Sequence, residues 1–183
     1  MTRIPTRRKK CPFFFGSWSK IQNVSVDEVG ENVKISLRED LHPDTEFYYH
    51  SQFKIYREPY LIWSKDTWRA LLAVCSVYSI VADGEYAGDI LLEERRKGTK
   101  YIVDFSLLPD YQRMGIGRAV LERIKRMGKR LTAVTRKETI QFFLKCGFGL
   151  KRRIKDYYDV GVDGYYIVFP GKTMEARCVT ENV

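Results

Sequence analysis

The strands of this chain are predicted from the alternation of its hydrophobic and polar residues. Residues 33–38 alternate with period two, so Val33, Ile35 and Leu37 share one face, as in a half-buried β-strand. Asp83-Gly84 lies between two further β-rich segments and is typical of a tight hairpin turn. We predict strands at residues 33–38, 76–82, 86–93, 101–108, 130–135, 148–154 and 165–169.

Helical periodicity separates these strands. Asp44 or Thr45 is expected to cap the first helix, and Ser64 or Asp66 the second. The order β-α-α-β-β-β-α-β-α-β-β predicts a mixed sheet with helices on both faces, in a single layered α/β domain. We predict helices at about residues 44–59, 64–72, 116–128 and 137–146.

Length and composition favour one soluble globular domain. The chain has 183 residues, of which 44% are hydrophobic and 30% charged, enough for a single core. No apolar run reaches about 18 residues, so no membrane span is expected. We expect residues 1–32 to form an N-terminal arm, 33–170 the folded domain and 171–183 a polar tail.

The cysteines and histidines do not suggest a metal site. Cys11, Cys75, Cys146 and Cys178 are scattered without a C-x-x-C spacing, and the chain has only two histidines. No metal is therefore expected. Free thiols in a reducing compartment are the simpler interpretation, so we expect a cytoplasmic protein.

A glycine-containing turn joins the strand at 101–108 to the helix that begins near Ile116. It reads Pro109-Asp-Tyr-Gln-Arg-Met-Gly-Ile-Gly-Arg118. The first turn of a helix leaves backbone N–H groups unpaired and carries a partial positive charge. Gly115 and Gly117 lack a Cβ, so a phosphate can approach the backbone closely. The turn therefore predicts an anion-binding site.

Charge is distributed unevenly along the chain. The net charge is +9, but residues 113–155 hold fourteen Lys or Arg against two acids, a local charge of +12. Residues 27–46 hold seven acids against Lys34 and Arg38, a local charge of −5. The basic block suggests either nucleic acid or a small ligand with several phosphates as partner.

Two motifs resemble those of the GNAT N-acetyltransferase superfamily. Gln112-Arg-Met-Gly-Ile-Gly117 is similar to the Q/R-x-x-G-x-G/A motif that binds acyl-CoA in that family. The preceding Leu107-Leu108-Pro109 resembles its V-x-P strand end, and Phe142-Phe-Leu-Lys-Cys-Gly-Phe148 resembles its second signature. The element order also resembles the family's, from about Val33 to Pro170, which implies a GNAT-like, largely antiparallel sheet.

The resemblance implies acetyl-CoA as co-substrate. N–H groups of the turn would hold the pyrophosphate, and the basic block supplies a favourable field. The Leu107 backbone would pair with the pantetheine arm. The arm would lie in a splay, the gap where the strand of Leu107 and the strand at 131–135 diverge. Residues expected to contact the coenzyme are Leu107, Leu108, Pro109, Gln112, Arg113, Met114, Gly115, Ile116, Gly117, Arg118, Phe143 and Lys145.

The chain departs from the family at the expected general acid. The family often has Tyr at the position of Phe143, and that hydroxyl protonates the leaving thiolate. Phe143 cannot do so, which leaves Tyr157, Tyr158 or a proton from solvent as alternatives. The family also often has Asn where Arg136 falls and Ala where Thr139 falls.

A general base must deprotonate the acceptor ammonium before it attacks. Asp104 is the first candidate, with Glu93 or Glu94 as alternatives. Strict strand alternation places Asp104 on one face with Ile102 and Ser106, opposite Val103 and Phe105.

These features predict an N-acetyltransferase that passes acetyl directly from acetyl-CoA to an amine within a ternary complex. The acidic residues 27–46 would lie beside the acceptor, which favours a cationic amine: a polyamine, a Lys side chain or a protein N-terminus. Tyr157-Tyr158 followed by Asp163-Gly-Tyr165 is similar to the ribosomal-protein alanine acetyltransferase branch, which favours a protein or peptide over a small amine. A nucleic-acid-binding module and a catalytically weak acyl-CoA sensor are the alternatives. Both a monomer and a homodimer are compatible with the sequence.

Overall fold

The computed structural model describes residues 23–29 by their backbone alone, and residues 33–95, 98–127 and 130–171 in full. The predicted arm before residue 23 and the tail after residue 171 lie outside the described residues. The strands are β1 (Asn23–Val29), β2 (Val33–Asp40), β3 (Ser76–Ala82), β4 (Glu85–Arg95), β5 (Thr99–Leu107), β6 (Arg130–Thr135), β7 (Gly149–Asp159) and β8 (Val162–Phe169). The helices are α1 (Thr45–Ile55), α2 (Lys65–Val74), α3 (Ile116–Met127) and α4 (Lys137–Lys145), with short 3₁₀ helices η1 (Pro59–Leu61) and η3 (Pro109–Tyr111).

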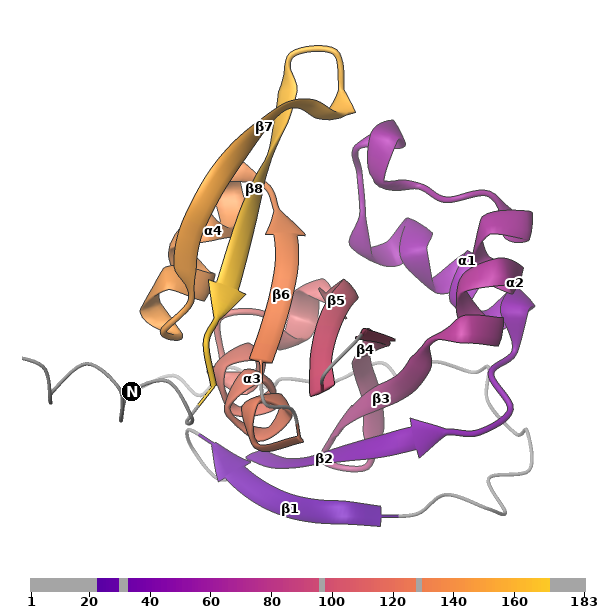
Figure 1. Ribbon diagram of the computed structural model, residues 1–183. Coiled ribbons are helices and arrows are strands. Elements are labelled where there is room, and N and C mark those ends of the chain that lie inside the picture. Colours follow the sequence, from indigo (N-terminus) through magenta and orange to yellow (C-terminus); the bar gives the residue numbers. More distant parts are fainter. Residues whose placement is uncertain (1–22, 30–32, 96–97, 128–129, 172–183) are drawn as a thin grey trace, which may run out of the picture.

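The eight described strands form one sheet in the order β1-β2-β3-β4-β5-β6-β8-β7 (Figure 1). Neighbouring strands are antiparallel except β5 and β6, which are parallel. A parallel pair needs a crossover, and α3 supplies it between β5 and β6. The predicted mixed, largely antiparallel sheet is confirmed, and each predicted strand and helix is present.

β1 was not predicted. It lies in the stretch that the sequence analysis assigned to the arm, and it pairs antiparallel with β2 from Asn23↔Arg38 to Val29↔Val33. The alternation of Val24 and Val26 with polar neighbours was the signal that could have identified it.

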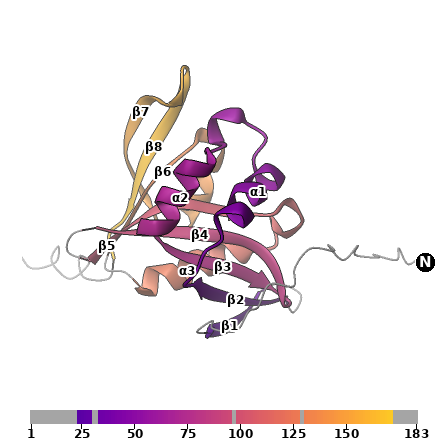
Figure 2. The ribbon, with the colours of Figure 1, turned by 90° about the vertical axis from the view of Figure 1, so that its right-hand side faces the viewer.

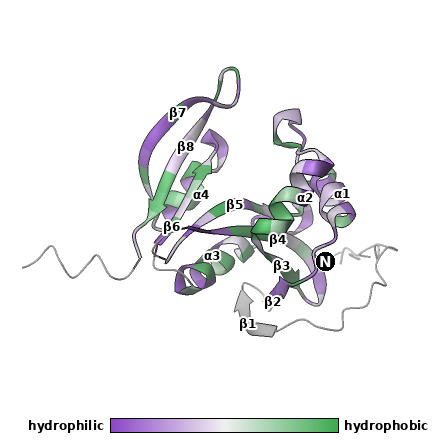
Figure 3. Ribbon diagram, turned by 45° about the vertical axis from the view of Figure 1, so that its right-hand side comes forward, coloured by the Kyte–Doolittle hydropathy of each residue, from purple (hydrophilic) through white to green (hydrophobic). Residues whose placement is uncertain are grey.

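Helices cover both faces of the sheet, as predicted (Figures 1 and 2). On one face, α3 and α4 pack on strand residues that include Ile90 and Leu92. On the other face, α1 and α2 place Tyr48 and Trp68 against a smaller cluster with Leu91. Successive residues of β4 thus point to opposite faces, as strand geometry requires. Hydrophobic residues concentrate in β3 and β4 at the centre of the sheet, whereas β7 at its edge is mainly hydrophilic (Figure 3).

Side-chain caps fix the starts of α1 and α2. The Asp44 Oδ1 atom accepts a hydrogen bond from the Glu46 N–H at 2.9 Å. Ser64 Oγ accepts one from the Thr67 N–H at 3.1 Å. Of the two cap residues expected for each helix, the structure therefore selects Asp44 and Ser64.

β5 and β6 separate half-way along their length. Their parallel pairing runs from Thr99↔Arg130 to Ile102↔Ala133 and then ends. Beyond that point, β5 pairs with β4 as far as Leu107, while the end of β6 pairs with β8. The splay predicted between these two strands is therefore present.

A β-bulge at Val103 changes the direction of the side chains that enter this splay. In the pairing of β4 with β5, Leu92 opposes Ile102 but Leu91 opposes Asp104, so Val103 is an extra residue. Ile102 packs in the α3/α4 cluster, whereas Val103 packs in the α1/α2 cluster. Asp104 bonds to Tyr56, at the end of α1, and so faces away from Ile102. The prediction that Asp104 shares a face with Ile102 is wrong, because it assumed uninterrupted alternation.

Gly88 of β4 allows close approach to the end of β5. A Cβ at this position would lie 2.1 Å from the Ser106 carbonyl oxygen and 2.9 Å from the Leu107 Cα. These are backbone atoms that cannot rotate away. Glycine at this position therefore holds β4 against the part of β5 that borders the splay.

We expect Gly88→Ala to lower the free energy of unfolding by about 3 kcal/mol, since the strands must move apart to admit the methyl group. Urea unfolding followed by circular dichroism measures this. Gly149→Ala is the matched control, because the nearest atom to its Cβ would be 3.8 Å away; its effect should stay within about 0.5 kcal/mol. Equal stabilities for the two variants would contradict this account of the strand spacing.

Candidate active site

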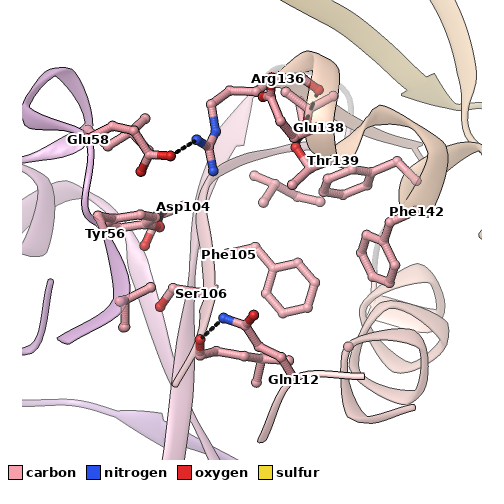
Figure 4. Close-up of a pocket in the computed structure, with 18 of the residues that line it drawn as sticks. Tyr56, Glu58, Asp104, Phe105, Ser106, Gln112, Arg136, Glu138, Thr139 and Phe142 are labelled. Atoms are coloured by element: carbon pink, nitrogen blue, oxygen red, sulfur yellow. Dashed lines mark hydrogen bonds and ion pairs between the residues drawn. The ribbon is translucent and has the colours of Figure 1, made fainter. Parts of the chain in front are cut away.

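A pocket of about 820 Å³ opens where β5 and β6 separate. One wall is the Ile102–Leu107 part of β5, and the opposite wall is the end of β6 with the start of α4. The segment from Ile55 to Trp63 and the turn from Pro109 to Arg118 line the rest of it. Figure 4 shows Asp104 with Tyr56 on one side of β5 and Phe105 with Phe142 on the other.

The turn after β5 presents unpaired backbone N–H groups. Arg113 and Gly115 adopt positive φ values, 62° and 83°, which end η3 and start α3. Among the described residues, none of the N–H groups from 113 to 118 donates to a backbone carbonyl; backbone bonding resumes with Ala119 N–H to Gly115 O at 3.1 Å. These donors and the positive end of the α3 dipole make this end of the pocket suitable for an anion.

Gly117 has a packing role in addition to the one expected from the sequence. A Cβ there would lie 3.2 Å from the Phe142 Cζ atom. The glycine therefore lets α3 approach α4 closely. Gly117 ends the motif at residues 112–117 and Phe142 begins the motif at residues 142–148, so the two motifs meet at this contact.

The pocket gathers most, but not all, of the residues expected to contact the coenzyme. Ile116 is fully buried in the α3/α4 core, Met114 packs against that core, and Lys145 is exposed at the end of α4. Leu108 uses its N–H to bond Ala87 O at 2.8 Å. The expected residues that line the pocket are Leu107, Pro109, Gln112, Arg113, Gly115, Gly117, Arg118 and Phe143; Leu108, Met114, Ile116 and Lys145 do not line it.

The Leu107 carbonyl has a partner within the protein. The Gln112 Nε2 atom donates to Leu107 O at 2.9 Å, as marked in Figure 4. Leu107 was expected to pair with the pantetheine arm. The Gln112 side chain therefore already bonds the Leu107 carbonyl, one of the backbone groups that such a ligand would use.

Asp104 and Asp89 form a carboxyl pair at the base of the pocket. The Asp104 Oδ1 atom accepts a hydrogen bond from Tyr56 Oη at 2.5 Å. Asp89, only 2% exposed on β4, accepts one from Ser106 Oγ at 3.1 Å and another from Tyr86 Oη. Ser106 thus lies on the face of Asp104, as predicted.

The environment favours the protonated forms of this pair. Burial raises the pKa of Asp104 above its ordinary value. Burial, followed by repulsion from Asp104, raises the pKa of Asp89 to about 8. Asp89 was missed in the sequence, although a charged residue followed by the apolar run Ile90-Leu91-Leu92 was a usable signal.

The two tyrosines considered as general acid point to different places, because successive residues of a strand face opposite sides. Tyr158 lines the pocket and donates through Oη to Val134 O at 2.9 Å. Burial raises its pKa, so it keeps its proton at neutral pH. Tyr157 does not line the pocket; its Oη lies 3.5 Å from Tyr101 Oη, and 45% of the residue is exposed. Phe143 packs between Phe142 and Phe148.

The alternative bases lie outside the pocket. Glu93 pairs with Arg95 at 3.0 Å, and Glu94 pairs with Lys100 at 2.6 Å. Neither lines the pocket, so Asp104 is the candidate that the structure places there.

The acidic residues 27–46 do not border the pocket in the part of the chain whose side chains are described. Asp40 accepts a hydrogen bond from Tyr48 Oη at 2.9 Å, Asp44 caps α1, and Glu46 pairs with Lys65. None of these acids lines the pocket, so the expectation that this stretch lies beside the acceptor is wrong for them.

Acidic and aromatic residues from the α1–η1 segment take that place instead. Glu58 Oε1 pairs with Arg136 Nη1 at 3.2 Å, an ion pair between that segment and the start of α4 (Figure 4). Tyr60 and Trp63 also line the pocket. Neither ring was predicted as a site residue, because nothing local in the sequence distinguishes a lining ring from a packed one.

The described residues include no helix with the length and hydrophobicity needed to span a lipid bilayer. They also contain no group of three His, Cys, Asp or Glu side chains placed to hold a metal ion.

Comparison with known proteins identifies the family. Residues 36–148 match the Acetyltransferase (GNAT) family. No curated protein matches the chain. The fold is similar to the ribosomal-protein-S18-alanine N-acetyltransferase of Escherichia coli, with a TM-score of 0.63, 21% identity and coverage of 74% of this chain and 93% of that one.

Two other solved structures have the same fold. One is a chimaeric spermidine N-acetyltransferase from Vibrio cholerae, with a TM-score of 0.61, 14% identity and coverage of 74% and 95% of the two chains. The other is a GNAT acetyltransferase from Elizabethkingia anophelis with acetyl-CoA bound, with a TM-score of 0.57, 16% identity and coverage of 74% and 97%. The chain therefore belongs to the GNAT acetyltransferase family of acyl-CoA-dependent transferases, whose co-substrate is acetyl-CoA.

Proposed function

We propose that this protein transfers an acetyl group from acetyl-CoA directly to the amine of a protein or peptide. The observation that carries the proposal is one pocket with an anion-binding turn at one end and a partly exposed carboxyl group, Asp104, at the other. In the reaction, an N–C bond forms and the C–S bond of the thioester breaks. The amine loses one proton, and the departing thiolate gains one.

The donor end would hold the coenzyme by its phosphates. The N–H groups from 113 to 118 have no backbone partner in the described chain, and the exposed side chains of Arg113 and Arg118 line the same end. Pyrophosphate matches both kinds of donor. Phe105 and Phe142, with ring centroids 6.1 Å apart, give the splay an apolar wall that suits the pantetheine arm.

Asp104 is the proposed general base. It lines the pocket, and Tyr56 Oη fixes one of its oxygens at 2.5 Å. Its raised pKa brings its basicity nearer to that of the amine it must deprotonate. The ammonium N–H bond breaks, the proton passes to the Asp104 carboxylate, and the amine nitrogen keeps the electron pair.

Tyr158 is the proposed general acid. It is the tyrosine of the expected pair whose side chain lines the pocket, and its hydroxyl is held by Val134 O. Phe143, at the family's usual Tyr position, has no proton to give. Tyr158 would therefore turn from Val134 O toward the departing sulfur.

Several features support a polypeptide amine as acceptor. The acceptor side of the pocket combines Glu58 and Asp104 with the rings of Tyr56, Tyr60 and Trp63, which suits a cation. The similar Escherichia coli structure is named for the alanine of a ribosomal protein, and the Tyr157–Tyr165 segment resembles that branch. The similar Vibrio cholerae enzyme is named for spermidine, so a small polyamine is the alternative acceptor.

Nucleic acid is less well supported as a partner. Of the basic residues on β7, Arg153 pairs with Asp163, and Lys155 Nζ lies 3.8 Å from Asp156 Oδ2. Part of the positive charge at this edge is therefore neutralised locally.

We expect Arg118→Ala to weaken acetyl-CoA binding about 10-fold, since it removes a cation at the phosphate end of the pocket. Isothermal titration of acetyl-CoA measures the change. Lys145→Ala is the control, because Lys145 is exposed and does not line the pocket; its affinity should remain within about 2-fold. A greater loss in Lys145→Ala than in Arg118→Ala would place the phosphates elsewhere.

We expect Asp104→Asn to lower kcat/KM for a peptide amine by about 100-fold or more, with acetyl-CoA affinity unchanged, because the amide cannot take the proton. In the wild type, kcat/KM should rise with pH as Asp104 ionises, and its midpoint should lie above about 4, the ordinary Asp value. Both the activity of the variant and the pH profile of the wild type are measured by the release of the CoA thiol over a range of pH. A variant as active as the wild type would rule out Asp104 as the base.

We expect Tyr158→Phe to lower kcat about 100-fold through loss of the proton for the thiolate. Tyr157→Phe, one residue away with its ring outside the pocket, should keep its kcat within about 2-fold. Steady-state rates on one peptide compare the two. The assignment fails if Tyr157→Phe loses more activity than Tyr158→Phe.

A further inference from the structure

Asp89 does not line the pocket, yet it contacts a residue that does. It lies in the centre of the sheet, opposite Ser106 of β5 and Ser79 of β3, and is 2% exposed. Both of its oxygens accept hydrogen bonds, Oδ1 from Ser106 at 3.1 Å and Oδ2 from Tyr86. It also interacts directly with Asp104, which borders the pocket.

Two ionised carboxylates at this site would be costly. Among the described residues, the salt bridges include neither Asp89 nor Asp104, so no cation neutralises them directly. Their direct donors are all neutral: the hydroxyls of Tyr56, Tyr86 and Ser106, and the backbone N–H of Phe105. Such donors stabilise one negative charge far better than two in contact.

We propose that Asp89 is a positioning residue that shares a single proton with Asp104, so that the pair enters each reaction with one negative charge, carried by Asp104. This inference rests on the proposed function of Asp104 as the base. The Asp89 O–H donates to one Asp104 oxygen, and Tyr56 donates to Asp104 Oδ1. Together they hold the carboxylate toward the pocket.

The proton balance follows from this arrangement. The acceptor ammonium gives its proton to Asp104, which becomes neutral while Asp89 keeps its own proton. Asp104 then returns the transferred proton to solvent through the open pocket, and the pair regains one negative charge. Asp89 takes part in no bond to the substrate.

The other groups that face the pair stay neutral over the relevant pH range. Tyr48 faces it from α1, Tyr56 from the end of α1, Tyr86 from β4 and Tyr158 from β7; burial raises the pKa of each above the ordinary tyrosine value. Asp40 lies beyond Tyr48, which donates to it at 2.9 Å. A titration observed at neutral to mildly alkaline pH therefore belongs to Asp89 and Asp104, in agreement with the raised pKa of both.

The test is an NMR titration of the full chain labelled with carbon-13 at the aspartate carboxyl carbons, without coenzyme or acceptor. In the wild type, we expect one carboxyl group to hold its proton to about pH 8. Asp89→Asn should abolish this step. Asp104→Asn should move it to lower pH, because the neighbouring charge is gone. Asp66→Asn, at an exposed position on α2, is the control and should leave the step in place.

Survival of the high-pH step in Asp89→Asn, or an unmoved step in Asp104→Asn, would overturn the shared proton. A second readout uses stability. Because the folded pair binds more protons than the unfolded chain, wild-type stability should fall as pH rises toward the upper pKa. Asp89→Asn removes that loss, so its stability relative to the wild type should rise between about pH 4, the ordinary Asp value, and about pH 8, and stay level above that. A pH-independent difference would contradict the proposal.

The kinetic readout separates this inference from the proposed function. In the wild type, the kcat/KM profile should show an inflection near pH 8, where Asp89 loses its proton. Asp89→Asn should lack this inflection, whereas replacing a residue that only packs would leave it in place. If Asp104→Asn remains fully active while the NMR step behaves as expected, the base assignment fails and the shared proton stands. If the NMR step does not behave as expected but Asp104→Asn is inactive, the shared proton is overturned and the assignment of Asp104 as the base stands.

Discussion

The site depends on the separation of β5 from β6 after the Ile102–Ala133 pair. Two paired strands leave no room for a ligand, whereas two diverging strands leave backbone groups and side chains facing a cavity. The bulge at Val103 occurs at the same point and turns Asp104 toward Tyr56 while Phe105 faces Phe142. One extra residue thus sets a polar wall, which carries the proposed general base, apart from an apolar wall, which suits a pantetheine chain.

Other features hold this geometry in place. Gly88 lets β4 approach the end of β5, and Gly117 lets α3 approach Phe142. These contacts fix the turn from Pro109 to Arg118 against the splay, so its N–H groups lie at one end of the pocket. The ion pair of Glu58 with Arg136 joins the α1–η1 segment to the start of α4. Each contact links residues far apart in the sequence, which is why the site needs the whole sheet.

Much of the fold could be predicted because its signals are local. The alternation of Val33, Ile35 and Leu37, the Asp83-Gly84 turn and the caps at Asp44 and Ser64 are each encoded within a few residues. The bulge at Val103 was missed because it is set by pairing with β4, so the predicted facing of Asp104 was wrong in part. Tyr56 and Glu58 were also missed as site residues, since only tertiary packing brings them to Asp104 and Arg136. Tyr157 and Tyr158 are equivalent in sequence and differ only in the direction that β7 gives them.

The central claim is that one splay holds both the coenzyme and the base. It is tested most directly by a crystal structure of the protein with CoA. The account predicts the pyrophosphate on the N–H groups of residues 113–118 and the thiol end between β5 and β6, beside Asp104. A coenzyme bound with its thiol outside the splay, or with its phosphates away from this turn, would contradict it.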